Sequence, residues 1–595
     1  MTKVMLLFPP HWTPTMPHLA LPVLTAYLRQ RGIDVVQHDL NVEYFNEILS
    51  RRYLRQAIER IRTRFGAGAS KRPTSYGRPS APQINWALSR GTGIADQVDS
   101  AMQVMRSHDF YDPNKSQKAF ETIVQAMQLV SLAYFPNLIE LTRFAAAGAV
   151  DQSKQLAKLV RDPQLNPFID FFTKGILQEI RTLKPDLVGI SIPTMDQMLA
   201  GMTIASMIKE AGLSCHVTVG GPHISMLRES LPNVPQVFQW IDSAVIFEGE
   251  IPLLKLVQAV VEKTGLEDVP GLIFRVGETG NSKQVVIRVT DPADGALRTA
   301  LEGLTPDFDG MPLKKYLIPE PVLPLASSHG CYHGKCGFCN VGYGHPERFF
   351  PLPIEMVVSQ MMTIREKFGA RHIFFTDEAI PPRTLRLLSQ RLEELGSPFN
   401  WCGCMRFEKT LTAPLLQQAK KGGCRMLLFG LETASEPMIE HMVKGVYKSE
   451  MSRILRESTQ AGIWNHTFFF FGFPGETLEN AQDTINFIYE HQDSIHSASP
   501  GTFLLERYSP VFLNPEKFGV SKIIEDPERD LAIYYDYELI SGLDEPAAQR
   551  VVDILLESLP EKRYGQYYIH DVPRFLYTSF LTGQGLPLPA WIADD

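Results

Sequence analysis

The organisation of this chain depends on one stretch, Ser328-His-Gly-Cys331-Tyr-His-Gly-Lys-Cys336-Gly-Phe-Cys339-Asn. Three cysteines lie within nine residues, with four residues between the first pair and two between the second. Structural zinc uses four closed ligands, whereas iron–sulfur clusters are held by closely spaced thiolates. A cubane held by three thiolates leaves one iron with open positions, where a small molecule can bind. The spacing therefore indicates a reactive metal centre at Cys331, Cys336 and Cys339.

Two other interpretations of these cysteines remain open at this point. They could be reduced thiols in a surface loop, or part of a zinc knuckle whose fourth ligand is His333, His345 or Cys402. The other four cysteines are expected to be small core residues, since a buried free cysteine is common. These are Cys215, Cys402, Cys404 and Cys424.

Length and composition describe an ordinary globular chain. Its 595 residues predict about three domains. A net charge of −8 without a long basic run gives no reason to expect a nucleic-acid partner. No signal peptide or membrane-spanning run is expected. Seven cysteines, three of them clustered, do not indicate a disulfide framework, so we expect a reducing, cytoplasmic location.

The first part of the chain alternates strands and helices, which predicts a doubly wound, Rossmann-like α/β sheet. The expected strands are Lys3–Pro10, Asp34–Asn41, Asp186–Ile192, His216–Gly220 and Ser243–Phe247, and the expected helices are Leu19–Gln30, Asp196–Ala211 and Pro252–Lys263. From about 42 to 184 the pattern is helical. An insertion of that length needs its own packed helices, because a structureless loop so long is improbable.

Ligands of such sheets bind outside the carboxyl ends of the strands. Small residues at the ends of the third and fourth strands would let a bulky ligand approach the backbone. No G-x-G-x-x-G sequence follows the first strand, which disfavours a dinucleotide. The residues at these ends are Pro9 to Trp12, Ser191 to Thr194, Gly220 to His223 and Phe247 to Glu250.

A second series of six β/α repeats predicts a parallel, partly open barrel. Its expected strands are Leu323–Ser327, His372–Thr376, Asn400–Met405, Arg425–Phe429, His466–Phe471 and Thr502–Glu506, with helices at Ile354–Phe368, Pro382–Leu395, Ala413–Lys421, Lys448–Ala461 and Leu478–His491. Catalytic groups of parallel barrels lie at the carboxyl ends of strands, where the cysteine stretch falls. The expected domains are 1–270, a hairpin and connector at 271–320, the barrel at 321–507 and a mainly helical region at 508–595.

The cysteine stretch resembles the radical S-adenosylmethionine (SAM) superfamily. It is similar to the Cys-Tyr-x-Gly-Lys-Cys-x-Phe-Cys variant of the cobalamin-binding branch, and Phe338 occupies the aromatic position. Most of the superfamily has three residues between the first two cysteines, and this chain has four. The resemblance implies a 4Fe-4S cluster on Cys331, Cys336 and Cys339. Its open iron would take the amino and carboxylate groups of SAM, whose reductive cleavage gives a 5′-deoxyadenosyl radical.

Four further turns also resemble the family, in the order of the barrel strands. Thr376-Asp377-Glu378 resembles the turn at the SAM amino group, and Arg406 could pair with the SAM carboxylate. Gly430-Leu-Glu432 begins a turn like the one near the SAM ribose or carboxylate, and Gly472-Phe-Pro474 one like the turn before the adenine region. Any one of them alone could be a helix cap or a solvated loop. The implied SAM-binding residues are Phe338, Thr376, Asp377, Glu378, Arg406, Glu432, Ser435, Gly472 and Pro474. Lys444-Gly445 also fits the family, but it is interpreted first as the end of a helix.

The N-terminal sheet resembles the cobalamin-binding domain of the same branch. Val219-Gly-Gly-Pro-His and Glu248-Gly-Glu are similar to its turns. The Asp-x-His-x-x-Gly sequence that supplies a cobalt ligand in many cobalamin proteins is absent. Loss of the ligand, or a nucleotide in its place, is the alternative. The implied cobalamin contacts are Pro10, His11, Trp12, Ser191, Thr194, Gly220, Gly221, His223, Glu248 and Gly249.

The resemblance implies a C-methyltransferase acting on an unactivated carbon of a natural product or peptide. One SAM would supply the methyl group through methylcobalamin and a second would supply the radical; no catalytic side chain is assigned. One alternative keeps both cofactors for a rearrangement, oxidation or ring closure, and another is a non-catalytic metal-binding or scaffold protein. The expected partners are a small-molecule or peptide substrate and an electron donor such as flavodoxin or ferredoxin, without nucleic acid or membrane.

Overall fold

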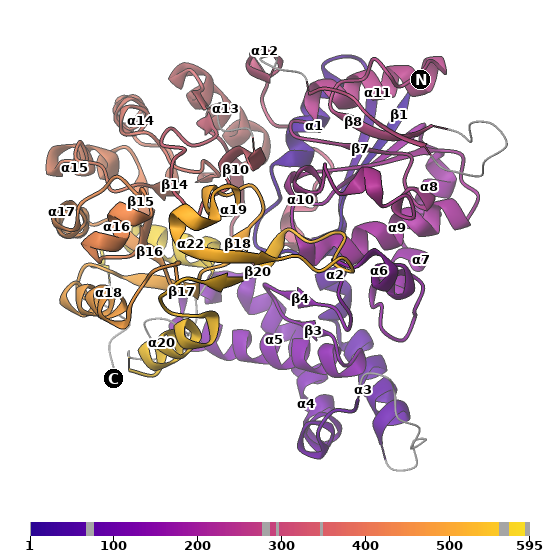
Figure 1. The fold of residues 1–595 in the computed structure, drawn as a ribbon, viewed down its shortest axis with the longest axis horizontal. Helices are drawn as coiled ribbons and strands as arrows, with labels where there is room; N and C mark the ends of the chain where they lie inside the picture. Colours follow the sequence, from indigo (N-terminus) through magenta and orange to yellow (C-terminus); the bar gives the residue numbers. More distant parts are fainter. Residues whose placement is uncertain are drawn as a thin grey trace. The chain divides into compact units, whose positions relative to one another are not determined.

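A computed structural model describes residues 2–66, 77–276, 286–292, 297–344, 349–558 and 570–588. The chain divides into two compact units, each with its own parallel sheet (Figure 1). The N-terminal unit is Met1–Pro319 with Asp526–Ala532, and the C-terminal unit is Glu320–Glu525 with Ile533–Asp595. His345, one of the candidate zinc ligands, lies outside the described residues. Among the described helices, none is long and apolar enough to cross a membrane.

The N-terminal unit is built on a seven-stranded sheet in the order β2-β1-β5-β6-β7-β8-β9. Its strands are β1 (Lys3–Phe8), β2 (Asp34–Asp39), β5 (Leu187–Ser191), β6 (His216–Gly220), β7 (Ser243–Val245), β8 (Leu272–Val276) and β9 (Val286–Val289). The first five are parallel. All five residues of β5 are buried, because helices flank a parallel sheet on both faces. The helices that follow these strands are α1 (Ala20–Arg29), α9 (Met198–Glu210), α10 (Pro222–Met226) and α11 (Glu250–Glu262).

The strand order defines a switch point, the place where doubly wound sheets bind their ligands. Without the insertion, the parallel strands follow the flavodoxin-like order 2-1-3-4-5, whose switch point lies between β1 and β5. The doubly wound fold is thus confirmed, with one difference. The hairpin at 271–289 is not a separate connector, because β8 pairs antiparallel with β7 and extends the sheet.

The insertion between β2 and β5 is helical, as expected. It contains α2 (Leu40–Ile48), α3 (Arg51–Phe65), α4 (Ala81–Met105), α5 (Pro113–Ala133), α6 (Ser153–Val160), α7 (Phe168–Lys174) and α8 (Ile176–Leu183), with the two-stranded sheet β3 (Leu138–Ile139) and β4 (Phe144–Ala145). A capping box of Ser80 and Gln83 starts α4. A Cβ at Gly91 would lie 2.9 Å from Ile58, so this glycine permits the close packing of α4 on α3.

The C-terminal unit is built on a six-stranded parallel sheet in the order β10-β13-β14-β15-β16-β17. Its strands are β10 (Val322–Leu325), β13 (His372–Phe375), β14 (Asn400–Met405), β15 (Cys424–Glu432), β16 (Trp464–Phe471) and β17 (Ser497–Thr502), and its helices are α13 (Ile354–Phe368), α14 (Pro382–Glu394), α15 (Ala413–Lys421), α16 (Glu436–His441), α17 (Lys448–Gln460) and α18 (Leu478–Glu490). The order does not return to β10, so the barrel is partial, as predicted.

The sixth strand lies earlier than predicted. β17 ends at Thr502, the residue where the expected strand begins. The sequence pattern does not predict β17, because Pro and Gly at 500–501 are atypical of a strand. Proline is tolerated here because β17 is the edge strand. Leu505–Glu506 instead forms β18, which pairs with another sheet.

The tail is less helical than expected. β18 joins β20 (Tyr534–Leu539) and β19 (Val520–Ile524) in an antiparallel sheet, accompanied by α19 (Pro510–Leu513), α20 (Glu545–Ser558) and α22 (Asp571–Gly583). The segment Asp526–Ala532 belongs to the N-terminal unit. There Asp530 accepts hydrogen bonds from the backbone N–H and the hydroxyl of Ser153, and Arg529 forms an ion pair with Asp151 at 2.7 Å.

Candidate active site

The cysteine loop begins where β10 ends, and a buried carboxylate fixes its start. Asp377, at the end of β13, accepts hydrogen bonds from the backbone N–H of Ser327 at 2.8 Å and from the hydroxyls of Ser327 and Ser328 at 2.7 and 2.6 Å. Asp377 is 3% exposed. Both oxygens therefore hold the segment that leads to Cys331, which gives Asp377 a positioning part in addition to its expected contact with SAM.

Gly337, between the second and third cysteines, is braced by two distant segments. Its backbone N–H donates to Met442 O at 2.8 Å, and its carbonyl accepts from Val511 N–H at 3.0 Å. A Cβ at Gly337 would lie 2.7 Å from the ring of Phe518. Met442, Val511 and Phe518 belong to one buried apolar cluster. The tail therefore helps to shape the cysteine loop, which the sequence did not indicate.

Arg406, at the end of β14, faces a cysteine. Its Nη1 donates to Cys336 Sγ at 3.6 Å and its Nε to Glu408 at 3.2 Å. Glu408 also accepts from the hydroxyl of Tyr332, a residue of the cysteine loop, at 2.9 Å. Burial raises the pKa of the Cys336 thiol, which Lys444 and Arg406 lower in part. Arg406 therefore stabilises negative charge on this sulfur, whereas the sequence suggested only a pairing with SAM.

Lys444, which the sequence interpretation assigned first to a helix end, lies beside the cysteine loop. It is 3% exposed, although lysine is almost never buried without a partner. Its Nζ donates to Glu432 at 2.9 Å and lies 5.6 Å from the ring centre of Phe338. Glu432 ends β15 with φ 60°. The Lys-Gly pair resembled a helix end, and the burial that distinguishes it depends on distant packing.

Two carboxylates gather near Cys339. Burial, together with the neighbouring Cys336 and Glu378, raises the pKa of the Cys339 thiol to about 12. Burial and the neighbouring Glu378 raise the pKa of Glu506, on β18, to about 7. Thr376 is tied back to β10 through its hydroxyl, which donates to Leu325 O at 3.2 Å. Glu378 and Glu506 thus form an acidic pair suited to a cationic group.

The turns after β15 and β16 are held mainly by internal contacts. The Ser435 hydroxyl donates to Asp483 at 3.2 Å and accepts from Asn480 at 3.1 Å, both on α18. The Gly472 N–H donates to Glu476, and a Cβ at Gly472 would lie 2.7 Å from Ala548. Ser435 and Gly472 therefore shape their turns. The Ser435 hydroxyl already has protein partners, and the space beside Gly472 is filled by another side chain. Pro474 lies in the second turn.

The remaining cysteines of this unit lie on strands. Cys402 and Cys424 are fully buried, and burial raises the pKa of both thiols, to about 12 for Cys424. Cys404 is half-buried on β14. His333, the other candidate zinc ligand, hydrogen-bonds Val443 O at 2.9 Å. Within the described ranges, no three His, Cys, Asp or Glu side chains are grouped to hold a single metal ion.

In the N-terminal unit, the carboxyl ends of four strands are joined into one edge. The Gln197 side chain donates to Pro9 O at 2.7 Å and lies 3.4 Å from the Thr194 hydroxyl, which links β1 to β5. Ser191 pairs in register with Gly220, which links β5 to β6. The Ser225 hydroxyl accepts from Phe247 N–H at 2.7 Å, which links the loop after β6 to the end of β7. The predicted cobalamin contacts thus lie along the carboxyl ends of β1, β5, β6 and β7.

Two histidines at this edge are buried and neutral. His11 and His223 are 1% and 2% exposed, and burial lowers the pKa of each to about 4. The Nε2 of His11 contacts Glu140 O in the insertion, and its ring lies 4.7 Å from that of Phe45. Among the described residues, the Nδ1 atoms of both histidines lack a hydrogen-bond partner. His11 packs under the insertion, which the sequence could not indicate.

The glycines at this edge serve packing as much as access. Gly221 has φ 109°, and a Cβ there would lie 2.8 Å from Ile192 O, so this glycine lets two strand ends meet. A Cβ at Gly249 would lie 3.2 Å from Leu24. The neighbouring Trp12 N–H donates to Asn41 at 2.8 Å. Burial raises the pKa of Glu250, which starts α11 beside Glu248, to about 7.

Comparisons with known proteins agree with this geometry. The profile of the radical SAM superfamily matches residues 325–488. An uncharacterized methyltransferase of Pyrococcus horikoshii is 27% identical over 365 residues, which is 59% of this chain and 76% of that protein. An anaerobic magnesium-protoporphyrin IX monomethyl ester cyclase of Rubrivivax gelatinosus is 25% identical over 53% of this chain and 57% of its own.

One solved structure matches nearly the whole fold. It is the radical SAM methyltransferase TsrM of Kitasatospora setae with cobalamin and a 4Fe-4S cluster bound, with a TM-score of 0.59 and 14% identity. The match covers 98% of this chain and 96% of that one. Residues 325–488 are therefore a radical SAM domain. Over the whole chain the fold is that of TsrM, and part of the sequence is similar to the Pyrococcus methyltransferase.

Proposed function

We propose that this chain is a cobalamin-dependent radical SAM C-methyltransferase that acts on an unactivated carbon of a natural product or peptide. The observation that carries the proposal is the three-cysteine loop at the end of β10, held by Asp377 and faced by Arg406. The same chain has a second parallel sheet with a flavodoxin-like switch point. A 4Fe-4S cluster and SAM fit the first site, and cobalamin fits the second.

The cysteine site suits a cluster with one open iron. Cys331, Cys336 and Cys339 would be its protein ligands. Arg406 donates to Cys336, and Lys444 lies near enough to lower the pKa of that thiol. Hydrogen bonds and positive charge near cluster sulfurs favour the reduced state. Glu378 and Glu506 would hold the ammonium group of SAM beside Cys339, and Phe338, Thr376, Glu432 and the turn at Gly472 and Pro474 would complete its site.

The switch-point edge suits a large polar ring. Cobalamin carries amide side chains that both donate and accept hydrogen bonds, and Pro10, Ser191 and Gly220 lie at this edge. The buried His11 and His223 have Nδ1 atoms without a hydrogen-bond partner in the described parts of the chain. Trp12, Thr194, Gly221, Glu248 and Gly249 would contribute the remaining contacts.

These cofactors supply chemistry that side chains lack, namely hydrogen abstraction from, and methyl delivery to, a carbon that is not a nucleophile. The protein's part is to position the groups and to exclude water. The substrate would be a small molecule or peptide, and a flavodoxin or ferredoxin would supply electrons.

A test that needs no substrate separates the two sites. The anaerobically reconstituted chain is mixed with reduced cobalamin and SAM labelled in its methyl group. We expect label on cobalamin, and separately 5′-deoxyadenosine when the cluster is reduced. Cys336→Ala should abolish the deoxyadenosine. Absence of iron–sulfur absorbance in the reconstituted wild type would disprove the proposal.

The relationship to an ester cyclase supports a second candidate. This candidate keeps both cofactors but closes a ring, rearranges or oxidises the substrate without methyl transfer. Once a substrate is identified, labelled methyl in the product supports methyl transfer. Deoxyadenosine formed together with unlabelled product supports the second candidate.

A further inference from the structure

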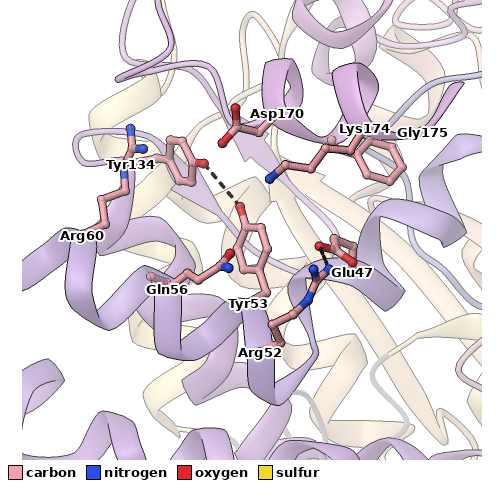
Figure 2. Close-up of a pocket in the computed structure, with 11 residues that line it drawn as sticks. Glu47, Arg52, Tyr53, Gln56, Arg60, Tyr134, Asp170, Lys174 and Gly175 are labelled. Carbon is pink, nitrogen blue, oxygen red and sulfur yellow. Dashed lines mark hydrogen bonds and ion pairs between the residues drawn. The ribbon is translucent and has the colours of Figure 1, made fainter. Parts of the chain in front are cut away.

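The helical insertion contains a cavity of about 370 Å³ that is remote in sequence from the cysteine loop. It lies among the ends of α2, α3, α5 and α7 (Figure 2). Ligand pockets for small molecules typically start at about 300 Å³. All the lining residues belong to the N-terminal unit.

One wall of the cavity carries hydroxyl groups. Tyr53 donates to the Tyr134 hydroxyl at 3.4 Å, which leaves the proton of Tyr134 available to a ligand. Burial raises the pKa of Tyr53 and of the adjacent Tyr44 well above the usual value, so both stay protonated. The Tyr44 hydroxyl, fully buried, has no partner within the described residues. Phe171, which packs 5.5 Å from Tyr44, supplies apolar surface.

Some charged side chains of the cavity already have protein partners. Arg52 is already paired with Glu47 at 2.5 Å. Arg60 donates to the carbonyls of Ala133, Pro163 and Gln164 and stacks over Tyr134 at 4.2 Å. These groups therefore build the walls of the cavity.

Lys174 and Asp170 are both exposed to solvent at this cavity. They lie one helical turn apart on α7, and no hydrogen bond or ion pair within the described ranges involves either side chain. Figure 2 shows both directed toward the space in front of the Tyr53 and Tyr134 hydroxyls. The Lys174 ammonium group, the Asp170 carboxylate and a tyrosine hydroxyl donor together match a ligand that carries both charges.

We infer that this cavity binds a small zwitterion of the α-amino acid class. The ligand carboxylate pairs with Lys174 and the Tyr134 hydroxyl, and its ammonium group pairs with Asp170. Phe171 and Ala57 contact the side chain of the ligand. The site is separate from the proposed SAM site and does not depend on the proposed reaction.

The test uses the full-length reconstituted chain, titrated once without SAM and once with it, because SAM fills the cysteine site but is itself an α-amino acid that could compete for the cavity. Each of the twenty free amino acids is titrated by calorimetry or saturation-transfer NMR. Lys174→Met and Asp170→Asn should each weaken the best binder by about 10- to 100-fold, since each removes a charge-assisted hydrogen bond. The N-acetyl derivative of that amino acid should bind weakly and be insensitive to Asp170→Asn.

Matched controls are Lys158→Met on α6 and Asp268→Asn, two exposed residues outside the cavity, which should change nothing. Tyr134→Phe keeps the ring and removes the donor, so it should weaken binding less than the loss of Lys174. The inference is overturned if no amino acid binds. It is also overturned if binding survives both α7 variants and disappears in Cys336→Ala, because the ligand would then occupy the cysteine site.

Discussion

Arg406, a residue that is 5% exposed, donates a hydrogen bond to the sulfur of Cys336 at 3.6 Å. Because its positive charge stabilises the more negative reduced cluster, Arg406→Met should lower the reduction potential. We expect about 60 mV, the equivalent of a tenfold change in a one-electron equilibrium. Redox titration followed by electron paramagnetic resonance measures it. Arg386→Met, on the exposed side of α14, is the control. An unchanged potential at full iron content would contradict this account.

Asp377 holds the start of the cysteine loop through three hydrogen bonds. Asp377→Ala leaves the Ser327 and Ser328 donors without a partner, so it should reduce iron incorporation and destabilise the C-terminal unit by about 3 kcal/mol. Iron content and urea unfolding measure the two effects. The exposed Asp493→Asn should change stability by less than about 0.5 kcal/mol.

Gly337 has no room for a side chain. Gly337→Ala should displace Phe518 and lower cluster occupancy, with a cost of about 2 kcal/mol for overpacking. The double variant with Phe518→Leu should regain iron, since the smaller side chain vacates the space. If Gly337→Ala alone binds iron as the wild type does, the tail does not constrain the loop.

Lys444 and Glu432 form a pair whose side chains are 3% and 13% exposed. Lys444→Met leaves a mostly buried carboxylate without its partner and should cost about 3 kcal/mol. Adding Glu432→Gln removes the orphaned charge and should restore part of the loss. A double-mutant cycle on the free energy of unfolding measures the coupling. Strictly additive single effects would show that the pair is energetically irrelevant.

Glu476 should make stability depend on pH. Burial raises its pKa to about 7 in the folded chain, against about 4.5 when unfolded. Because the folded carboxyl binds its proton more tightly, this contribution is fully present below pH 4.5 and is lost as pH rises through 7. Glu476→Gln should therefore gain about 3 kcal/mol relative to wild type between pH 5 and pH 8. Urea unfolding of both proteins at the two pH values tests it; a constant difference would refute it.

The sequence predicts elements whose hydrophobic period is regular. Helix Ile354–Phe368 and strand His216–Gly220 occur within the predicted bounds, because local apolar spacing decides them. The edge strand Ser497–Thr502 was predicted in the wrong place, since Pro500 and Gly501 obscure it. Strand Tyr534–Leu539 alternates aromatic and acidic residues and was not recognised.

For the candidate site too, the sequence predicts the locally patterned features and not the long-range contacts. Motif spacing indicates the three cysteines and the strand ends that accompany them. It does not indicate that Arg406 faces Cys336, that Lys444 is buried, or that Phe518 fills the space beside Gly337. Each of these depends on segments brought together only by folding. Sequence order alone carries no information about such contacts.

The Asp526–Ala532 segment, which bonds to Ser153 and Asp151, has a practical consequence. Truncating the chain after residue 319 would give an N-terminal fragment that lacks this segment. The Ser153 hydroxyl would then lose its carboxylate acceptor. A truncation meant to isolate the first sheet should therefore be supplemented with a synthetic peptide covering 524–534. Such a fragment should be more soluble with the peptide than without it.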